Sequence, residues 1–321
     1  MIRKAGNGSF YCANRAMTSL EAIIDENMLA SHHGYTPGHV TRGRSRYSHR
    51  HEHAHGERLV SNHRTKTGAH PRRLEMFAPV GFPLVSPGTP LLPLILKTLQ
   101  ENDLPLCNRD ILVVTQKILS KSENRYVRLA DVEASPRARE LAAICNKDAR
   151  MVEMVLRESD RIVRCTRDIL IVRHRLGFVS ANAGIDRSNI ESGDTQILLL
   201  PENPDRSAAE LRAGIHQSCG VDVGVLIIDS FGRPWRLGTC GVCIGSAGIV
   251  ALNDYRGRTD LSRRRMEVTE VAQADEIAAA ASILMGPSDQ ALPIVIVRGL
   301  DFGGTGRAAD LIRPVEQDQF L

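Results

Sequence analysis

The sequence predicts a folded domain of mixed helices and strands that follows a disordered N-terminal tail. Residues 1–75 contain nine of the eleven histidines and twelve Lys or Arg against six Asp or Glu, without a long apolar period. Such a segment cannot bury enough apolar surface to offset the entropy lost on ordering. Residues 76–321 contain β-branched runs and amphipathic segments, which are typical of buried strands and of helices. We therefore expect a tail over 1–75 and one folded domain over 76–321.

The folded part is predicted to begin with an extended segment, a helix and a strand. Pro and Gly are frequent over 76–90, which excludes a helix there. Leucine and isoleucine side chains form one apolar face over 91–102 and predict the helix. The run Asp110–Thr115 predicts a buried strand, and 116–121 follows its end. The two lysines of 116–121 suit a phosphate-facing edge, and a solvated loop is the alternative.

The middle of the domain is predicted to contain a long helical segment and two strands. Ser135 is a suitable N-cap and Pro136 a suitable first helical residue. The helical pattern extends to about Ser159, with a break over 146–148. The two strands are predicted over Ile169–Val172 and Gln196–Leu200.

Two further helices and two strands are predicted toward the C-terminus. Ser207 and Glu210 form a capping-box pattern that predicts the start of a helix ended by Gly220. The alanine-rich segment 267–285 predicts another helix, which Gly286 ends. The remaining features are a strand over 223–230, a glycine-rich stretch over 241–248 that predicts close backbone packing, and a strand over 293–297.

The stretch 174–189 is the strongest candidate for chemistry. It predicts a short strand, a turn at Gly184 and a loop that presents Asp186, Ser188 and Asn189. The strand that begins at Val223 finishes in a second acid and hydroxyl, Asp229 and Ser230. Oxygen ligands suit a hard divalent cation and the phosphates it carries. Because ligands gather at the carboxyl ends of strands, the two acids can share one site. The alternative is that Asp186 is a turn former and Asp229 a helix N-cap.

Charge and cysteine content exclude several classes of protein. Residues 76–321 contain 29 basic and 31 acidic residues, so we do not expect a nucleic-acid-binding body. The basic tail can bind polyanions weakly, and the histidines of 49–55 can bind a transition metal. A further hypothesis is that the start of the protein is misassigned and that the native chain begins at Met76. No signal peptide or membrane span is predicted. Seven cysteines fit a cytoplasmic location, and we interpret Cys240 and Cys243 as packed residues.

One further segment offers charged groups for a ligand. Arg233 and Arg236 flank Trp235, the only tryptophan. The two guanidinium groups can bind carboxylate or phosphate in a bidentate manner. The alternative is that they form surface salt bridges around a packed tryptophan. The sequence has no Walker A pattern and no serine nucleophile elbow.

Six stretches together resemble one family, the coenzyme F420-0:L-glutamate ligases, which are γ-glutamyl ligases that complete a deazaflavin coenzyme. The stretches are 113–121, 176–189, 199–205, 228–238, 268–281 and 295–299. The resemblance extends from about 77 to the C-terminus. It implies an α+β fold of mixed sheets with packed helices that works as a homodimer. Some relatives continue into a flavin-dependent reductase-like domain, an activity that we do not expect here because the chain stops at Leu321.

The resemblance also implies a nucleotide site with two divalent cations, Mg²⁺ or Mn²⁺, and a potassium ion. By this resemblance Asp186 and Asp229 bind one divalent cation and Ser230 the other. The residues that match nucleotide contacts are Phe82, Pro83, Leu84, Val85, Thr115, Gln116, Lys121, Asn189, Met285 and Gly286. Residues 287–291 depart from the glycine-rich acidic loop of relatives, which leaves a ligand of the second cation unassigned.

The implied reaction joins the carboxylate of the deazaflavin precursor to the amine of L-glutamate through an acyl phosphate made with GTP. Phosphoryl transfer needs alignment and charge neutralisation, which the cations and Lys121, with Arg233 or Arg236, can supply. The number of glutamates added is not readable from the sequence. Two alternatives stay open: a nucleotide-dependent amide ligase with another acceptor or amino acid, and a non-catalytic nucleotide-binding protein.

Overall fold

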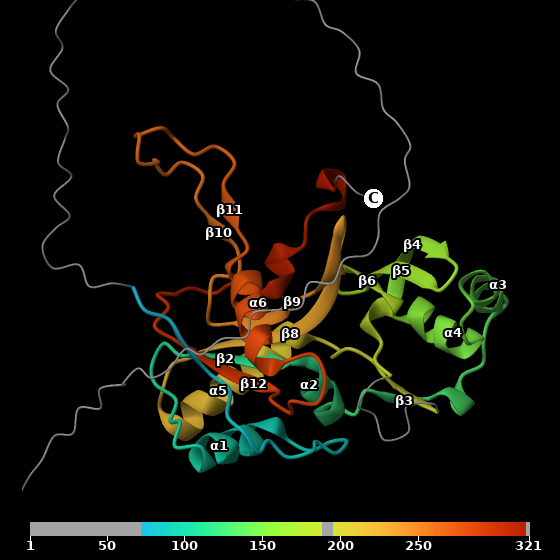
Figure 1. Cartoon of the computed structure of the whole chain (residues 1–321), viewed down its shortest axis with the longest axis horizontal. Helices are drawn as coiled ribbons and strands as arrows, with labels where there is room; N and C mark the ends of the chain where they lie inside the picture. Colours follow the sequence, from blue (N-terminus) through green and yellow to red (C-terminus); the bar gives the residue numbers. More distant parts are fainter. Residues whose placement is uncertain (1–71, 188–194, 319–321) are drawn as a thin grey trace, which may run out of the picture. The chain divides into compact units, whose positions relative to one another are not determined.

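The computed structural model describes residues 72–187 and 195–318, and a five-stranded mixed sheet is central to them. The strand order is β1-β12-β2-β8-β9 (Figure 1). The strands are β1 (Glu75–Phe77), β2 (Ile111–Thr115), β8 (Gly224–Arg233), β9 (Arg236–Ala247) and β12 (Ile294–Arg298). Strands β2 and β8 are parallel, whereas the other neighbours are antiparallel. The carboxyl ends of β2 and β8 therefore lie at the same edge of the sheet.

Helices cover both faces of this sheet. Helices α1 (Leu91–Glu101) and α5 (Pro204–Cys219) contact one face, where Leu112 and Val114 of β2 join their core. Helix α6 (Gln273–Met285) covers the other face, where Ile111 and Val113 are buried. Figure 1 shows α1 and α5 below the sheet and α6 above it. Successive side chains of β2 point to opposite faces of the sheet. Because helices cover both faces, the side chains on both sides of this strand are apolar.

A second group of elements has its own core. A three-stranded antiparallel sheet and two helices enclose it, together with the strand pair β3-β7. Its helices and strands are α3 (Pro136–Cys145), α4 (Ala149–Arg157), β3 (Tyr126–Arg128), β4 (Ser159–Thr166), β5 (Ile169–His174), β6 (Val179–Ala181) and β7 (Gln196–Leu198). The helix break predicted over 146–148 is confirmed, because Asn146 adopts a left-handed conformation and Asp148 caps α4.

The remaining elements are short. A hairpin carries β10 (Asn253–Asp254) and β11 (Glu270–Val271) and projects at the upper left of Figure 1. The short 3₁₀ segments are η1 (Leu129–Asp131), η2 (Asn182–Gly184), η3 (Ala308–Leu311) and η4 (Val315–Gln317). None of the helices in the described part of the chain has the length and apolar content to span a membrane.

Several predicted boundaries are wrong. Residues 116–121, expected as an edge or loop, belong to helix α2 (Gln116–Ser122). The strand expected to finish at Ser230 continues to Arg233, because it pairs with β9 in a long hairpin. The predicted capping box at Ser207 is not the start of α5, whose cap is Asn203, and α6 begins at Gln273 because β11 occupies part of the alanine-rich segment.

The glycine-rich stretch forms part of β9 and packs closely, as predicted. A Cβ atom on Gly241 would lie 2.5 Å from the backbone oxygen of Ala278 in α6. A Cβ atom on Gly245 would lie 2.5 Å from the backbone of Pro204 in α5. Residues without a side chain therefore let both helices approach β9.

A buried ion pair holds the sheet at the edge opposite to the carboxyl end of β2. Asp110 is 1% exposed and accepts hydrogen bonds of 2.8 and 2.7 Å from Arg298 of β12. The backbone N–H of Cys107 donates to the same carboxylate over 2.8 Å. Asp110 holds the pKa of Arg298 above its usual value. The guanidinium group also lies 5.6 Å from the ring centroid of Phe77.

We expect Asp110→Asn to lower the free energy of unfolding by about 2–4 kcal/mol, because it removes the charge of a buried carboxylate and leaves the partly buried guanidinium group of Arg298 without its counter-charge. Urea denaturation at neutral pH measures the change. Asp222→Asn is the matched control, since Asp222 forms an exposed pair with Arg212 and should cost less than about 1 kcal/mol. Equal losses for the two variants would contradict the importance of the buried pair.

Candidate functional site

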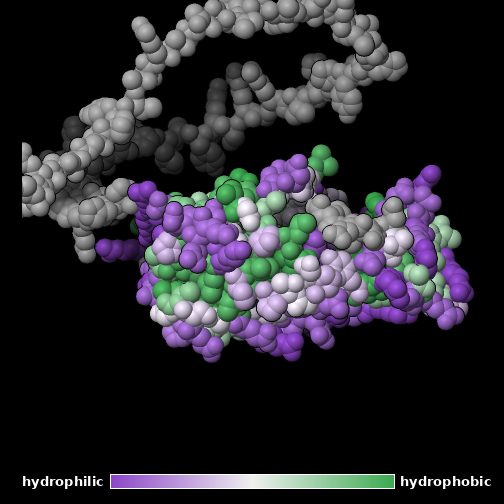
Figure 2. All heavy atoms as spheres, turned by 90° about the horizontal axis from the view of Figure 1, so that it is seen from below, coloured by the Kyte–Doolittle hydropathy of each residue, from purple (hydrophilic) through white to green (hydrophobic). Residues whose placement is uncertain are grey.

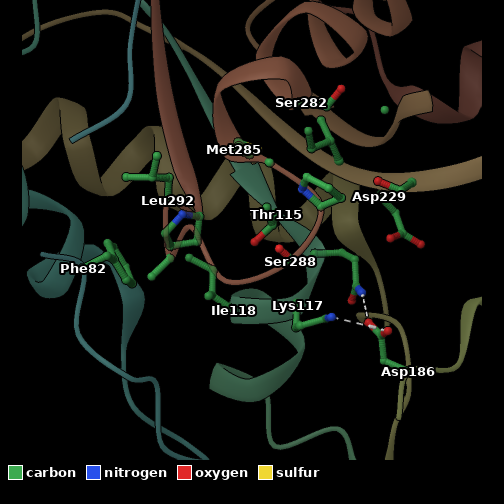
Figure 3. A pocket seen from close by; sticks show the side chains of 18 of the residues that line it. Phe82, Thr115, Lys117, Ile118, Asp186, Asp229, Ser282, Met285, Ser288 and Leu292 are labelled. Carbon is green, nitrogen blue, oxygen red and sulfur yellow. Dashed lines mark hydrogen bonds and ion pairs between the residues drawn. The ribbon is translucent and has the colours of Figure 1, made fainter. Parts of the chain in front are cut away.

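A cleft of about 620 Å³ opens where β2 ends, beside residues Ile228–Ser230 in the middle of β8. Its walls come from the segment before α1, from α2, from the β8-β9 hairpin and from the end of α6 with the loop that follows. Figure 3 shows Asp186 and Asp229 at one end of this cleft and the apolar side chains Phe82 and Leu292 at the other. A volume of this size suits a small-molecule ligand with one charged and one apolar part.

Asp186 is positioned by an unusual turn and by a backbone bridge. Asn182, Ala183 and Gly184 have successive φ values of 51°, 55° and 65°, so three consecutive residues before Asp186 are left-handed. For non-glycine residues this conformation costs about 1–2 kcal/mol each. The N–H and C=O groups of Asp186 then form hydrogen bonds of 2.9 and 3.0 Å with Leu198. The carboxylate is thus held by a strained turn that β7 supports.

The first turn of α2 contacts Asp186. Gln116 Nε2 donates to Asp186 Oδ2 over 2.8 Å, and Lys117 Nζ lies 3.4 Å from Oδ1 (Figure 3). Gln116 is buried, and its Oε1 accepts a hydrogen bond of 2.9 Å from Ser120. Because its amide is held from both sides, Gln116 presents its N–H group to the carboxylate in a fixed orientation.

Asp229 is close enough to Asp186 for the two charges to interact. Burial, together with the negative charge of Asp186, raises the pKa of Asp229 to about 7, although hydrogen bonds from Ser230 and Gln116 and the charge of Lys117 act in the opposite direction. The two acids, which are far apart in the sequence, therefore meet as expected. Two carboxylates that share a site favour either a proton or a cation between them.

The structure brings most of the predicted site residues to this cleft. Those in its lining are Phe82, Pro83, Leu84, Val85, Thr115, Gln116, Lys121, Asp186, Asp229, Ser230, Met285 and Gly286. Asn189 and Ser188 lie outside the described residues. The roles assigned to these residues by resemblance stay predictions, because their position alone does not test them.

Arg233 and Arg236 are not in the lining of the cleft. They face each other across the tip of the β8-β9 hairpin and are exposed. Trp235, at the tip, is 92% exposed, so the alternative of a packed tryptophan is wrong. The sequence predicted that the strand ends at Ser230, which would leave both arginines near the site. In the structure β8 continues to Arg233, so the hairpin places both arginines at its tip, outside the cleft lining.

Several lining residues were not assigned to the site from the sequence. Ser282 of α6 and Thr239 of β9 line the same cleft, as does Cys240, which the sequence analysis interpreted as a packed residue. Asp289, in the loop 287–291 that departs from relatives, lines it too. The β8-β9 register explains two of them, because Cys240 pairs with Phe231 and Thr239 pairs with Gly232. Register of this kind has no local sequence signal.

A second hollow, of about 560 Å³, lies between the end of α1 and Cys219 at the end of α5. Leucine side chains at 96, 99, 104 and 106 dominate its lining, and Asp103 is the only charged residue that the described part of the chain contributes to it. Figure 2 shows apolar surface in patches over the lower face, which carries α1. Among the residues that the structure describes, none gives this hollow a cationic side chain for a phosphate, so the first cleft is the better candidate for a nucleotide.

The donor atoms of the first cleft fit a hard cation. The oxygens of Asp186, Asp229 and Ser230 line one end, and carboxylate and hydroxyl oxygens are ligands of Mg²⁺ and Mn²⁺. The described residues contain no group of three His, Cys, Asp or Glu side chains arranged for a metal ion. A cation here would therefore complete its coordination with ligand or water oxygens, as Mg²⁺ commonly does with phosphates.

Comparison with known proteins decides the family. The family model described as F420-0:Gamma-glutamyl ligase matches residues 79–299, a range that includes every residue of the cleft lining. The chain belongs to this ligase family.

Curated relatives agree with the family match. A protein of Methanothermobacter thermautotrophicus named Coenzyme F420:L-glutamate ligase is 40% identical over 243 residues, which cover 75% of this chain and 96% of the relative. Proteins of the same name from Methanopyrus kandleri and Archaeoglobus fulgidus are each 42% identical, and cover 74% and 77% of this chain. The alignments cover 93% and 96% of these two relatives.

The raised pKa of Asp229 predicts a pH dependence of stability. The folded metal-free protein keeps the Asp229 proton up to about pH 7, whereas the unfolded chain loses it near the usual aspartate pKa of 3.8. The free energy of unfolding should therefore fall as the pH rises between these values. We expect Asp229→Asn to remove this slope and to stabilise the metal-free protein by roughly 1–3 kcal/mol at about pH 8. Urea unfolding in the presence of a chelator, at several pH values, measures it; a destabilised variant at high pH would contradict the burial argument.

Proposed function

We propose that this chain is a GTP-dependent ligase that adds L-glutamate to the deazaflavin precursor coenzyme F420-0. Family membership and the names of the relatives support the ligase activity. The single observation that carries the nucleotide chemistry is the convergence of Asp186 and Asp229 at one end of a cleft whose lining also contains Lys117 and Lys121. Carboxylates for a cation and ammonium groups for phosphate are the components of a phosphoryl-transfer site.

The proposed reaction has two steps. A carboxylate oxygen of the precursor attacks the γ-phosphorus of GTP, the bond to the bridging oxygen breaks, and GDP leaves. The amine of L-glutamate then attacks the acyl carbon, phosphate leaves, and the nitrogen gives up a proton. A free carboxylate is a poor acyl donor, so the first step supplies the activation that amide formation requires.

The residues of the cleft divide between these tasks. Asp186 and Asp229 would hold one divalent cation and Ser230 the other, and Asp289 is a further oxygen donor in the lining. When bound, the cations neutralise charge on the phosphate oxygens. Lys117 and Lys121 orient phosphate groups through their ammonium donors.

The apolar end of the same cleft suits the nucleotide base. Phe82 and Val85 are buried, whereas Leu84, between them in sequence, is 89% exposed and free to contact a ligand. Leu292 lines the cleft on the same side as Phe82 (Figure 3), and Met285 is also part of the lining. An apolar wall at this place can stack against the flat face of a base while the phosphates lie toward the two acids.

Two parts of the proposal concern organisation. We propose that residues 76–321 form the ligase domain and that it works as a homodimer. The family match over 79–299 supports the first part. Gel filtration with light scattering tests the second.

A direct assay tests the activity. The purified protein is incubated with coenzyme F420-0, L-glutamate, GTP and Mn²⁺, and products are measured by mass spectrometry and by release of GDP. We expect a glutamyl adduct, and we expect Asp229→Asn to lower kcat by at least about 100-fold, since one cation ligand loses its charge. Asp103→Asn, in the second hollow, is the control and should keep full activity. The proposed function is refuted if the unmodified protein forms neither the glutamyl adduct nor GDP.

Cation affinity should depend on pH. A proton occupies Asp229 up to about pH 7 in the absence of a cation, so binding of Mn²⁺ has to displace it. We expect the dissociation constant for Mn²⁺ to rise about tenfold for each unit of pH below 7. Titration calorimetry in two buffers of different ionisation enthalpy measures the affinity and the proton released. A pH-independent affinity between pH 6 and 8 would contradict Asp229 as a ligand.

A further inference from the structure

We infer that Glu158, which lies outside the cleft, is a positioning residue that keeps Asp186 and Asp229 at the spacing required by a shared cation. The inference rests on the proposed function, because it concerns the same pair of acids. It adds a residue that neither the cleft lining nor the resemblance includes. One contiguous set of contacts leads from Glu158 to each of the two acids.

Glu158 is at the centre of a buried cluster of charged groups. It follows α4, is 9% exposed, and its Oε2 lies 3.3 Å from Arg125 Nη2 and 3.1 Å from Arg175 Nε. His174, which is fully buried, has its Nε2 3.5 Å from the same oxygen. The Nδ1 atom of His174 accepts a hydrogen bond of 3.0 Å from the backbone N–H of Leu176, which orients the ring with Nε2 toward Glu158.

The charge state of this cluster is stable. Burial raises the pKa of Glu158, but His174 and the guanidinium groups of Arg175 and Arg125 lower it more, so the pKa lies below its usual value. The carboxylate is therefore charged at neutral pH. A buried charge surrounded by two guanidinium groups and a histidine ring contributes little net stability, yet it restricts these groups to one arrangement.

The first set of contacts leads from Glu158 to Asp186. Arg125 Nε donates to the backbone oxygen of Leu200 over 2.9 Å, and Arg175 Nη1 donates to that of Glu202 over 3.0 Å. Both carbonyl groups belong to the segment between β7 and α5. The guanidinium groups thus fix this segment relative to Glu158.

The same segment supports the turn that carries Asp186. A Cβ atom on Gly184 would lie 2.7 Å from Leu200 Cδ1, so this turn is in close contact with Leu200. Asp186 itself exchanges two backbone hydrogen bonds with Leu198. A displacement of 198–202 would therefore move Asp186 with it.

The second set of contacts leads from Glu158 to Asp229 through three rings. The His174 ring stacks on Phe178, with centroids 5.1 Å apart and an interplanar angle of 10°. Phe178 contacts Phe231 at a centroid distance of 4.8 Å. Phe231 is two residues after Asp229 on the same strand, β8, so its side chain is on the same face of the strand. The rings thereby connect the cluster to the strand that holds Asp229.

The test measures Mn²⁺ binding by the full chain after Glu158→Gln, which keeps the shape of the side chain and removes its charge. Electron paramagnetic resonance of free Mn²⁺ gives the dissociation constant well below the unfolding temperature. We expect this constant to rise about tenfold, as on loss of groups that orient metal ligands. The KM for Mn²⁺ in the ligase assay should rise with it, whereas kcat at saturating Mn²⁺ should change less.

Asp110→Asn is the matched control, because it also removes the charge of a buried carboxylate paired with arginine, at the opposite edge of the sheet. It should lower stability and leave Mn²⁺ affinity unchanged. Phe178→Leu interrupts the ring contacts and should weaken Mn²⁺ binding, whereas Phe178→Tyr keeps the rings and should restore it. These two variants keep the inference testable if Glu158→Gln does not fold.

The outcomes separate the inference from the proposed function. If the unmodified protein binds Mn²⁺ and forms the adduct, but Glu158→Gln and Phe178→Leu bind Mn²⁺ with unchanged affinity, Glu158 is only structural and the inference is overturned. An equal loss of Mn²⁺ affinity in Asp110→Asn would overturn it too. If the unmodified protein binds no Mn²⁺ and forms no adduct, the proposed function itself fails.

Discussion

The site depends on keeping two carboxylates together although they repel each other. Asp186 follows a left-handed turn beside β7, and Asp229 lies on β8 of the central sheet. Gln116 and Lys117 contact Asp186 and offset part of the repulsion. Burial and the neighbouring charge still raise the pKa of Asp229 to about 7. The architecture around the cleft can be understood as the support for this unfavourable pair.

The central sheet provides the main part of that support. Parallel pairing places Thr115 of β2 beside Ile228 of β8, so α2 begins next to Asp229. Side chains of β2 pack into a separate core on each face of the sheet, so a shift by one residue would misplace the side chains of both cores. The sheet can therefore tolerate a destabilising acid at its edge, and the same acid is suited to bind a cation.

The features that sequence patterns predicted well are local. The first helix, the break between α3 and α4, and the glycines that end α5 and α6 agree with the structure, since caps and breaks depend on neighbouring residues. The strand end at Ser230 and the helix starts at Ser207 and in 267–285 were wrong. In the structure β8 continues past Ser230 because it pairs with β9, and α5 begins after a cap at Asn203. The start of the segment 267–285 contains β11, which pairs with β10. These features depend on the surrounding fold.

The sequence by itself determined which residue types the site would contain and the strands and turns that carry them, because those patterns are local in the chain. Only the tertiary structure decided that Asp186 and Asp229 meet, that Arg233 and Arg236 do not join them, and that Glu158 connects to both. Strand register and the packing of one core against another set these relations. Such contacts join residues far apart in the chain, and no local pattern encodes them.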